Sequence, residues 1–293
     1  VENFAGQWLR LRELDTALPQ DNAFTASLRD SYREETERLF YDLIREDRSL
    51  LHLLNADYTW LNAELAAIYG IDNVRGAYMR KVALPESSPR RGLLGQGSIL
   101  TATSVANRTS PVIRGEWIVE NILGAPVPVP PPGVETDLSG ETVPAGRVVN
   151  TLRDRLELHR ENPTCAACHQ VMDPVGFALE NFDLIGRWRE EDSGYPVNPV
   201  SALVDGTPIA SPQDLRKALL ARGDTVATAF TEKLLTYALG RSIEYYDMPA
   251  VRKIMTAAET TDYRFSTVIL GIVASLPFQY KSASTNTLTT AGP

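Results

Sequence analysis

The sequence predicts a mainly α-helical protein, and three observations carry that prediction. Apolar residues recur at helical spacing in many segments of the chain. Residues that favour helix ends stand at the borders of several of these segments. Few runs have the composition of a strand, and residues 200–204 are the best of them.

Residues 1–124 are predicted to form a helical N-terminal region. Apolar side chains at helical spacing indicate a first helix, namely Phe4, Trp8, Leu11 and Leu14. A charged amphipathic segment over residues 27–45 predicts a longer helix. Its apolar stripe consists of Leu28, Tyr32, Leu39, Leu43 and Ile44.

A third helix is predicted between Asp57, as its N-cap, and Gly70, as its C-terminal stop. Residues 71–109 contain a glycine cluster and are expected to be irregular. Ser110, followed by proline, favours the start of a further helix that runs towards Gly124.

A proline-rich linker is predicted over residues 125–146, because its prolines favour extended polyproline II. Residues 147–200 are predicted to form a segment that binds a cofactor, with a helix over 147–160 and a short helix beginning at Phe177. Residues 201–293 are predicted to form a helical C-terminal region that ends in a polar tail. Its expected helices cover about 211–222, with Ser211 as the cap, 224–239, with Gly240 as the stop, 248–259 and 264–275.

The chain has only two cysteines and three histidines, and three of these five residues form the motif Cys165-Ala-Ala-Cys168-His169. C-x-x-C-H is typical of covalent c-type haem attachment. The two sulfurs match the spacing of the haem vinyl groups, and the next histidine supplies the axial imidazole. We therefore expect one covalent haem c, held by the two cysteines, with His169 on the iron.

Two other interpretations of the motif remain open at this stage. A thioredoxin-like dithiol normally follows a strand, whereas helical segments flank these cysteines. A structural zinc site needs four ligands, and even with His159 added to the motif the set is one short.

The second axial ligand of the iron has two candidates. His159 ends the predicted helix before the motif, where it could instead interact with the helix terminus. Met248 is the second candidate, or else a first-turn helix residue. A thioether ligand would raise the reduction potential relative to a second imidazole, and an open position would admit peroxide or small gases.

Four further residues are candidates for the haem pocket. Arg160 is a candidate partner of the haem propionates, although it could equally be solvated. Phe177, Phe182 and Trp188 are expected to line the pocket, with a plain core role as the alternative.

The net charge of −8 gives no basic footprint and predicts no nucleic-acid partner. No apolar run is long enough to predict a membrane-spanning helix. Because haem c is attached after export, the motif predicts a periplasmic or extracellular protein. The chain opens at Val1 without a signal peptide, which suggests a processed or partial product.

The chain resembles the planctomycete-type cytochrome c proteins, whose C-terminal halves consist of domains of unknown function. The resembling stretches, besides the proline run, are FAGQWL (4–9), RTSPVIRG (108–115), HRENPTCAACH (159–169), MDPVGFALENFD (172–183), TEKLLTYALGR (231–241) and PFQ (277–279). The resemblance implies an exported haem protein. It also implies that the chain is a C-terminal portion, because such proteins usually extend further at the N-terminus.

The leading function hypothesis is electron transfer by a monohaem cytochrome within a larger envelope redox complex, with redox proteins as partners. No other catalytic constellation stands out in the sequence, so whether the protein has a substrate of its own stays open. The alternatives are a peroxidase-like or oxygenase-like haem enzyme with an open iron position, and a structural haem-bearing subunit of an assembly.

Overall fold

The computed structural model describes residues 2–128 and 143–280 and confirms a mainly α-helical protein. The helices before the linker are α1 (Glu2–Trp8), the 3-10 helix η1 (Leu11–Asp15), α2 (Ala26–Arg45), α3 (His52–Asn55), α4 (Ala63–Tyr69), the 3-10 helix η2 (Leu93–Gly95), α5 (Gly97–Ala102), α6 (Pro111–Trp117) and the π-helical turn η3 (Ile118–Ile122). Those after it are α7 (Leu152–His159), α8 (Pro163–Phe177), α9 (Pro212–Leu220), α10 (Gly223–Leu239), α11 (Met248–Glu259), α12 (Phe265–Val273) and α13 (Leu276–Gln279).

The strands of the described chain form separate antiparallel pairs. Their members are β1 (Tyr58–Leu61) with β2 (Arg80–Ala83), β3 (Ser104–Val105) with β4 (Arg108–Thr109), β5 (Glu191–Asp192) with β6 (Tyr195–Pro196), and β7 (Ser201–Ala202) with β8 (Pro208–Ile209). In the longest pair, Tyr58 stands opposite Ala83 and Leu61 opposite Arg80. Of the strand expected at residues 200–204, Ser201 and Ala202 are strand, as β7.

Local capping explains many of the helix ends. Ser110 accepts a hydrogen bond from the Ile113 N–H at the start of α6, as expected. Helix α7 begins at Leu152, later than expected, because Thr151 and Asp154 form a capping box there. Gly240 ends α10 in the left-handed conformation, with a φ of 65°.

The region 71–109 is irregular, as expected, and its longest helix is the six-residue α5, which packs on α2. Three other expectations about local structure are wrong. Asp57 caps no helix, because residues 58–61 pair with β2 as strand β1, and α4 begins instead after Asn62. Phe177 ends α8 and begins no new helix. Ile44 is 38% exposed and lies outside the core.

The expectations for residues 129–142 of the proline-rich linker and for the polar tail fall outside the described residues. The helix ends expected at Gly70 and Gly240, and the helices expected over 224–239 and 248–259, are confirmed.

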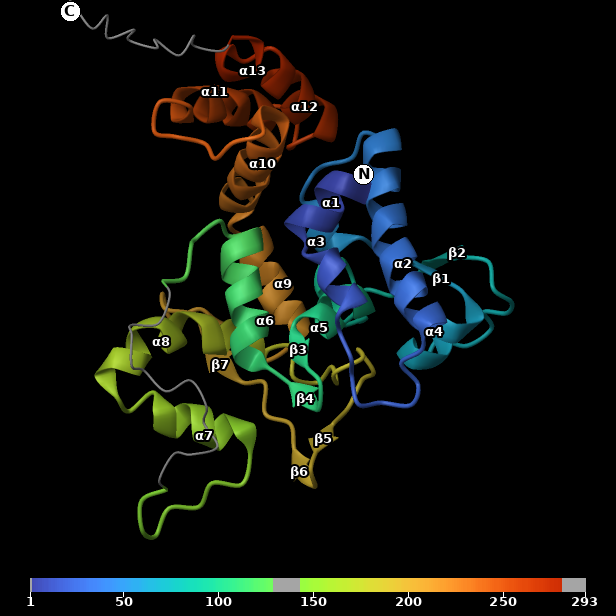
Figure 1. The fold of residues 1–293 in the computed structure, drawn as a ribbon, viewed down its shortest axis with the longest axis vertical. Helices are drawn as coiled ribbons and strands as arrows, with labels where there is room; N and C mark the ends of the chain where they lie inside the picture. The colour runs from blue at the N-terminus through green and yellow to red at the C-terminus, as the bar shows by residue number, and fades with distance from the viewer. Residues whose placement is uncertain (1, 129–142, 281–293) are drawn as a thin grey trace, which may run out of the picture.

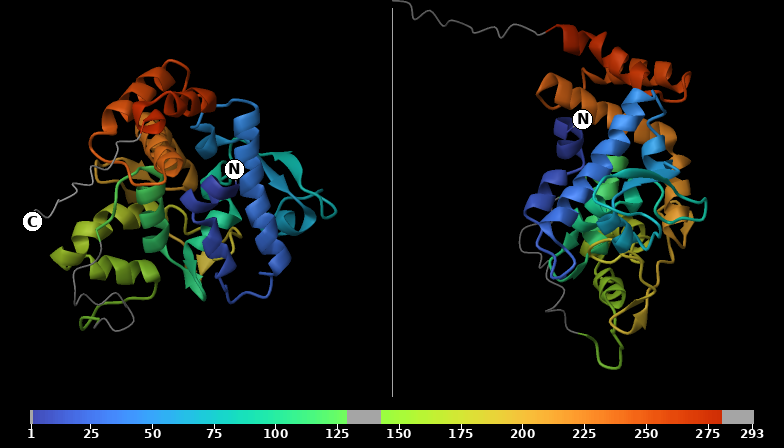
Figure 2. Two further views of the ribbon diagram at one scale, coloured as in Figure 1. Left: turned by 45° about the horizontal axis from the view of Figure 1, so that its top comes forward. Right: turned by 90° about the vertical axis from the view of Figure 1, so that its right-hand side faces the viewer.

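The main apolar core joins segments that are far apart in the sequence. It includes Trp8, Trp117, Phe182, Phe230 and Val268. A smaller core lies between α2 and α4. Helices α7 and α8 lie at one edge of the molecule beside α6, while α11–α13 form the opposite end (Figures 1 and 2). The predicted domain borders stay predictions.

Helix α6 packs directly on α8, and two glycines make this approach possible. A Cβ atom on Gly115 would stand 2.0 Å from the carbonyl oxygen of Met172, and one on Gly176 would stand 1.8 Å from that of Pro111. Both distances are far below van der Waals contact, so only glycine fits at these positions. This contact fixes the position of the helix that carries the cysteine motif.

Candidate functional site

The cysteine motif lies on the first two turns of α8. Asn162 accepts a hydrogen bond from the Thr164 N–H (3.0 Å), and Pro163 occupies the first helical position, so the Asn-Pro pair sets the start of the helix. Cys165 and Cys168 are three residues apart on this helix, which places their Cβ atoms about 5–6 Å from each other on one face. Both thiols are free and partly exposed.

His169 directly follows Cys168, and its imidazole ring is held by a hydrogen bond at Nδ1. Its Nδ1 atom lies 2.9 Å from Oδ1 of Asp173, one helical turn further along α8. The Asp173 side chain is completely buried. With Nδ1 occupied by a carboxylate, Nε2 is the nitrogen that remains for a metal ion.

The end of α7 covers this histidine and its carboxylate. His159 is buried, and its ring meets the His169 ring edge-to-face with centroids 4.8 Å apart. Arg160 places Nε 3.7 Å from Oδ2 of Asp173. The structure thus brings three of the sequence-predicted site residues, His159, Arg160 and His169, to one point.

The placement of His159 differs from that of an opposite axial ligand. With metal–nitrogen bonds of about 2 Å, two imidazoles on opposite faces of one iron have ring centres roughly 6 Å apart. The rings of His159 and His169 are closer than that and meet edge-to-face. In this arrangement His159 packs beside His169.

Met248, the other candidate ligand, is not brought to the motif. It lies at the start of α11, where it packs against the main apolar core. Helix α11 is at the opposite end of the molecule from α8 (Figures 1 and 2).

The three aromatic candidates separate into two places. Phe177 is buried at the end of α8, with the guanidinium groups of Arg153 and Arg160 at 4.5 and 5.8 Å from its ring centre. Phe182 belongs to the main core and contacts the ring of Trp188 edge-on at 5.3 Å. The Trp188 side chain is 44% exposed. Of these three aromatic residues, Phe177 is the one that contacts Arg160, which in turn lies beside the carboxylate that holds His169.

Arg114 of α6 is a structural residue that the sequence analysis did not single out. Its fully buried guanidinium donates to the carbonyl oxygens of Leu179 and Phe182 (2.9 and 2.8 Å) and forms an ion pair with Glu180 (3.0 Å). It thereby fixes the turn that follows α8. Asp173 was missed as well, although its position four residues after His169 on a helix was a usable signal.

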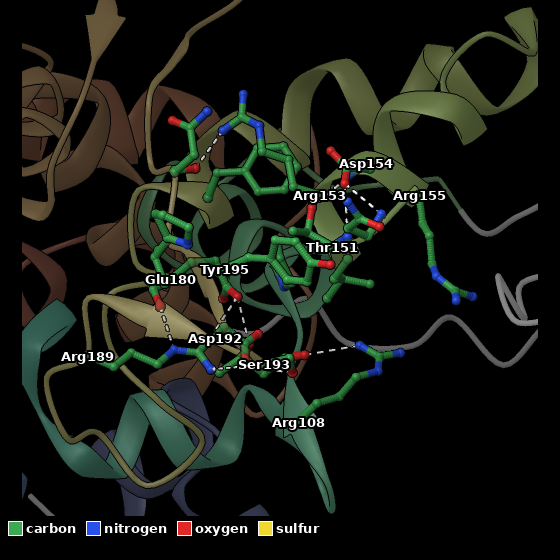
Figure 3. A pocket seen from close by; sticks show the side chains of 18 of the residues that line it. Arg108, Thr151, Arg153, Asp154, Arg155, Glu180, Arg189, Asp192, Ser193 and Tyr195 are labelled. Carbon is green, nitrogen blue, oxygen red and sulfur yellow. Dashed lines mark hydrogen bonds and ion pairs between the residues drawn. The ribbon is translucent and has the colours of Figure 1, made fainter. Parts of the chain in front are cut away.

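A pocket with a volume of about 890 Å³ is lined in part by residues of α7 (Figure 3). Its walls mix arginines with carboxylates, and Arg189 pairs there with Glu180 (3.3 Å) and Asp192 (3.0 Å). Neither cysteine of the motif lines this pocket, nor does His169. The pocket is therefore separate from the motif.

The residues at the start of α8 fit a covalently attached haem. The two thiols are unpaired and partly exposed, and the ring of His169 is oriented by the hydrogen bond at Nδ1, which leaves Nε2 for an iron. Within residues 2–128 and 143–280, no three His, Cys, Asp or Glu side chains are grouped to hold a metal ion. A structural zinc site needs four such ligands.

Three family models match successive parts of the chain. All three families are described as proteins of unknown function. Residues 1–71 match the DUF1592 family, residues 90–192 the DUF1588 family, and residues 205–278 the DUF1585 family. These domains are found in planctomycete cytochrome c family proteins. The chain carries all three. The resemblance is thus supported at the level of domains, and the cysteine motif falls within the second match. No curated protein and no solved structure matches the chain.

Across the described part of the chain, no helix combines the length and apolar character needed to cross a bilayer.

Proposed function

We propose that this protein is an exported monohaem c-type cytochrome that transfers electrons. One observation carries the proposal: Cys165, Cys168 and His169 lie together at the exposed start of α8, and the Nδ1 atom of the histidine is already bound to Asp173. The three matched domains support it, since they occur in cytochrome c family proteins.

When bound, the haem would supply a one-electron couple between ferrous and ferric iron. Cys165 and Cys168 would hold it through thioether bonds, and Nε2 of His169 would bind the iron. The chain contributes rigidity around that point, because the second half of α8 is buried against α6. A rigid axial ligand suits electron transfer, in which the ligands stay unchanged.

The proposal includes location and partners. Covalent attachment after export places the protein in the periplasm or outside the cell. Electron transfer requires a donor and an acceptor, so redox proteins, among them other subunits of an envelope complex, are the expected partners.

The test is production of the chain in a host that matures c-type cytochromes, followed by denaturation and mass measurement. We expect a polypeptide that keeps its haem absorption and carries the mass of one haem. The double variant Cys165→Ser and Cys168→Ser should lose both, whereas Ala166→Ser on the same turn should keep them. A wild-type chain with the mass of its amino acids alone would refute the proposal.

A haem enzyme with an open iron position is the second candidate. It is favoured by the position of His159, which packs beside His169, and by that of Met248, which lies at the far end of the molecule. Absorption and EPR spectra of the ferric protein separate the two functions. A low-spin spectrum supports electron transfer, whereas a high-spin spectrum with rapid reaction towards peroxide supports the enzyme.

A further inference from the structure

The side chain of Asp173 is completely buried, although nothing in its position along α8 requires a buried carboxylate. Asp173 lies one turn after the partly exposed His169. It is in the middle of α8, so it caps no helix end. Burying a carboxylate costs free energy unless charged or hydrogen-bonding partners offset that cost.

The partners of the Asp173 carboxylate include His169, on the same helix, and Arg160, at the end of α7. Oδ1 lies 2.9 Å from Nδ1 of His169. Oδ2 is buried and makes no hydrogen bond within the described chain, and Nε of Arg160 lies 3.7 Å from it. Among residues 2–128 and 143–280, the hydrogen-bond partner of this carboxylate is therefore His169, and Arg160 is its counter-charge.

We propose that Asp173 is a positioning residue that fixes the tautomer and orientation of His169 and strengthens electron donation from its Nε2 to the iron. This inference rests on the proposed function, since it concerns the axial ligand of the haem. A carboxylate that accepts the Nδ1 proton makes the imidazole more basic at its other nitrogen. A more basic ligand stabilises ferric iron relative to ferrous iron, so Asp173 lowers the reduction potential.

Arg160 limits this effect from the end of α7. Its positive charge beside Oδ2 draws charge density away from the carboxylate, so the donation from Nε2 is weaker than with Asp173 alone. Arg160, the first residue after α7, thus raises the reduction potential through Asp173, without contact to the iron. This gives Arg160 a role in addition to its contact with Phe177.

The test is a redox titration of the haem-loaded protein and matched variants. Asp173→Asn keeps the shape but removes the charge, and we expect the ferrous-to-ferric ratio at a fixed ambient potential to rise at least tenfold, which is 59 mV for one electron. Arg160→Gln should shift the ratio in the other direction, about threefold. Glu157→Gln and Arg153→Gln make the same charge changes on α7, within an ion pair that does not contact Asp173, and should change the ratio by much less.

Covalent haem content, measured on the same samples, keeps this inference apart from the proposed function. A wild-type chain without haem refutes the function. Haem-loaded Asp173→Asn with an unchanged ratio refutes the role of Asp173. If Asp173→Asn does not fold, Arg160→Gln decides: a shift no larger than that of Arg153→Gln overturns the proposal.

Discussion

Within α8, the first half carries the cysteine motif and remains partly exposed, whereas the second half, residues 172–177, is buried. Cys165 and Cys168 have free thiols at the surface. Gly176, by contrast, contacts the backbone of α6 so closely that no side chain fits. The same helix therefore joins a partly exposed motif half to a buried, closely packed anchor half.

The difference shows how a short motif can be held rigidly without being enclosed. The anchor half takes its position from α6, through the two glycines and Arg114. The motif half needs only a helix start, which Asn162 and Pro163 provide. Substitutions in the anchor half should accordingly affect folding, and those in the motif half should affect haem attachment.

The largest effect is expected from Arg114→Met, which removes the buried cation at the end of the anchor half. Loss of one partner of a buried ion pair typically costs about 3–5 kcal/mol. Several carbonyl groups, including those of Leu179 and Phe182, would lose their donor as well. Urea unfolding measures the change. Arg108→Met, at an exposed arginine in the same domain, is the control, and equal stability of the two variants would contradict the comparison.

Gly176→Ala should come next, because its Cβ atom would stand 1.8 Å from a backbone oxygen of α6. We expect a loss of about 3 kcal/mol, at the upper end of overpacking effects. Ala167→Val adds volume to the exposed half of the same helix and should cost less than about 1 kcal/mol. Similar unfolding midpoints for both variants would show that the two halves do not differ.

The buried carboxylate of Glu35, outside α8, offers an independent test of how burial affects stability. Glu35 of α2 accepts hydrogen bonds from Thr59 and Tyr69, and burial raises its pKa to about 7. The folded chain keeps this proton up to that pH, whereas the unfolded chain releases it near the usual value of 4.5. The free energy of unfolding should therefore fall as the pH rises from 4.5 to 7, by about 2–3 kcal/mol, and level off above it.

Urea unfolding of wild type and Glu35→Gln between pH 4.5 and 8 checks this expectation. The difference between the two proteins isolates Glu35 from other titrating groups. A difference that stays constant across the range would show that this carboxylate does not hold a proton in the folded chain.

The smallest effect is expected from Thr151→Ala, which removes the capping box of α7. Loss of such a cap costs about 1 kcal/mol. Because the end of α7 packs on His169, the variant also tests whether this packing contributes to the free energy of unfolding. The control is Thr164→Ala, at an exposed threonine near the N-cap residue of α8, Asn162. We expect its free energy of unfolding to stay close to that of wild type.

Helix ends were predictable where the signal is local. Ser110, Ser211 and Gly240 act through hydrogen bonds or backbone angles within a few residues, so sequence alone locates them. The motif residues were predictable for the same reason, because Cys165 to His169 are contiguous and their spacing is the signal.

What failed depends on partners distant in the sequence. Residues 58–61 become a strand only because residues 80–83 pair with them, and no local pattern around Asp57 shows this. The role of Arg114 depends on the turn after α8, which lies more than sixty residues away. The position of His159 beside His169 follows from how α7 folds back, which depends on packing.

The π-helical turn η3 has a consequence for how the two ends of the molecule are oriented. It continues α6, yet it packs on α10 as well as on α8, and its Asn121 carbonyl accepts a hydrogen bond from the Trp8 indole. A wider turn accommodates one more residue than an α-helix, and each residue rotates the chain by about 100°. One more residue in this turn therefore rotates the face that η3 presents to α10 by about 100° relative to the face that α6 presents to α8.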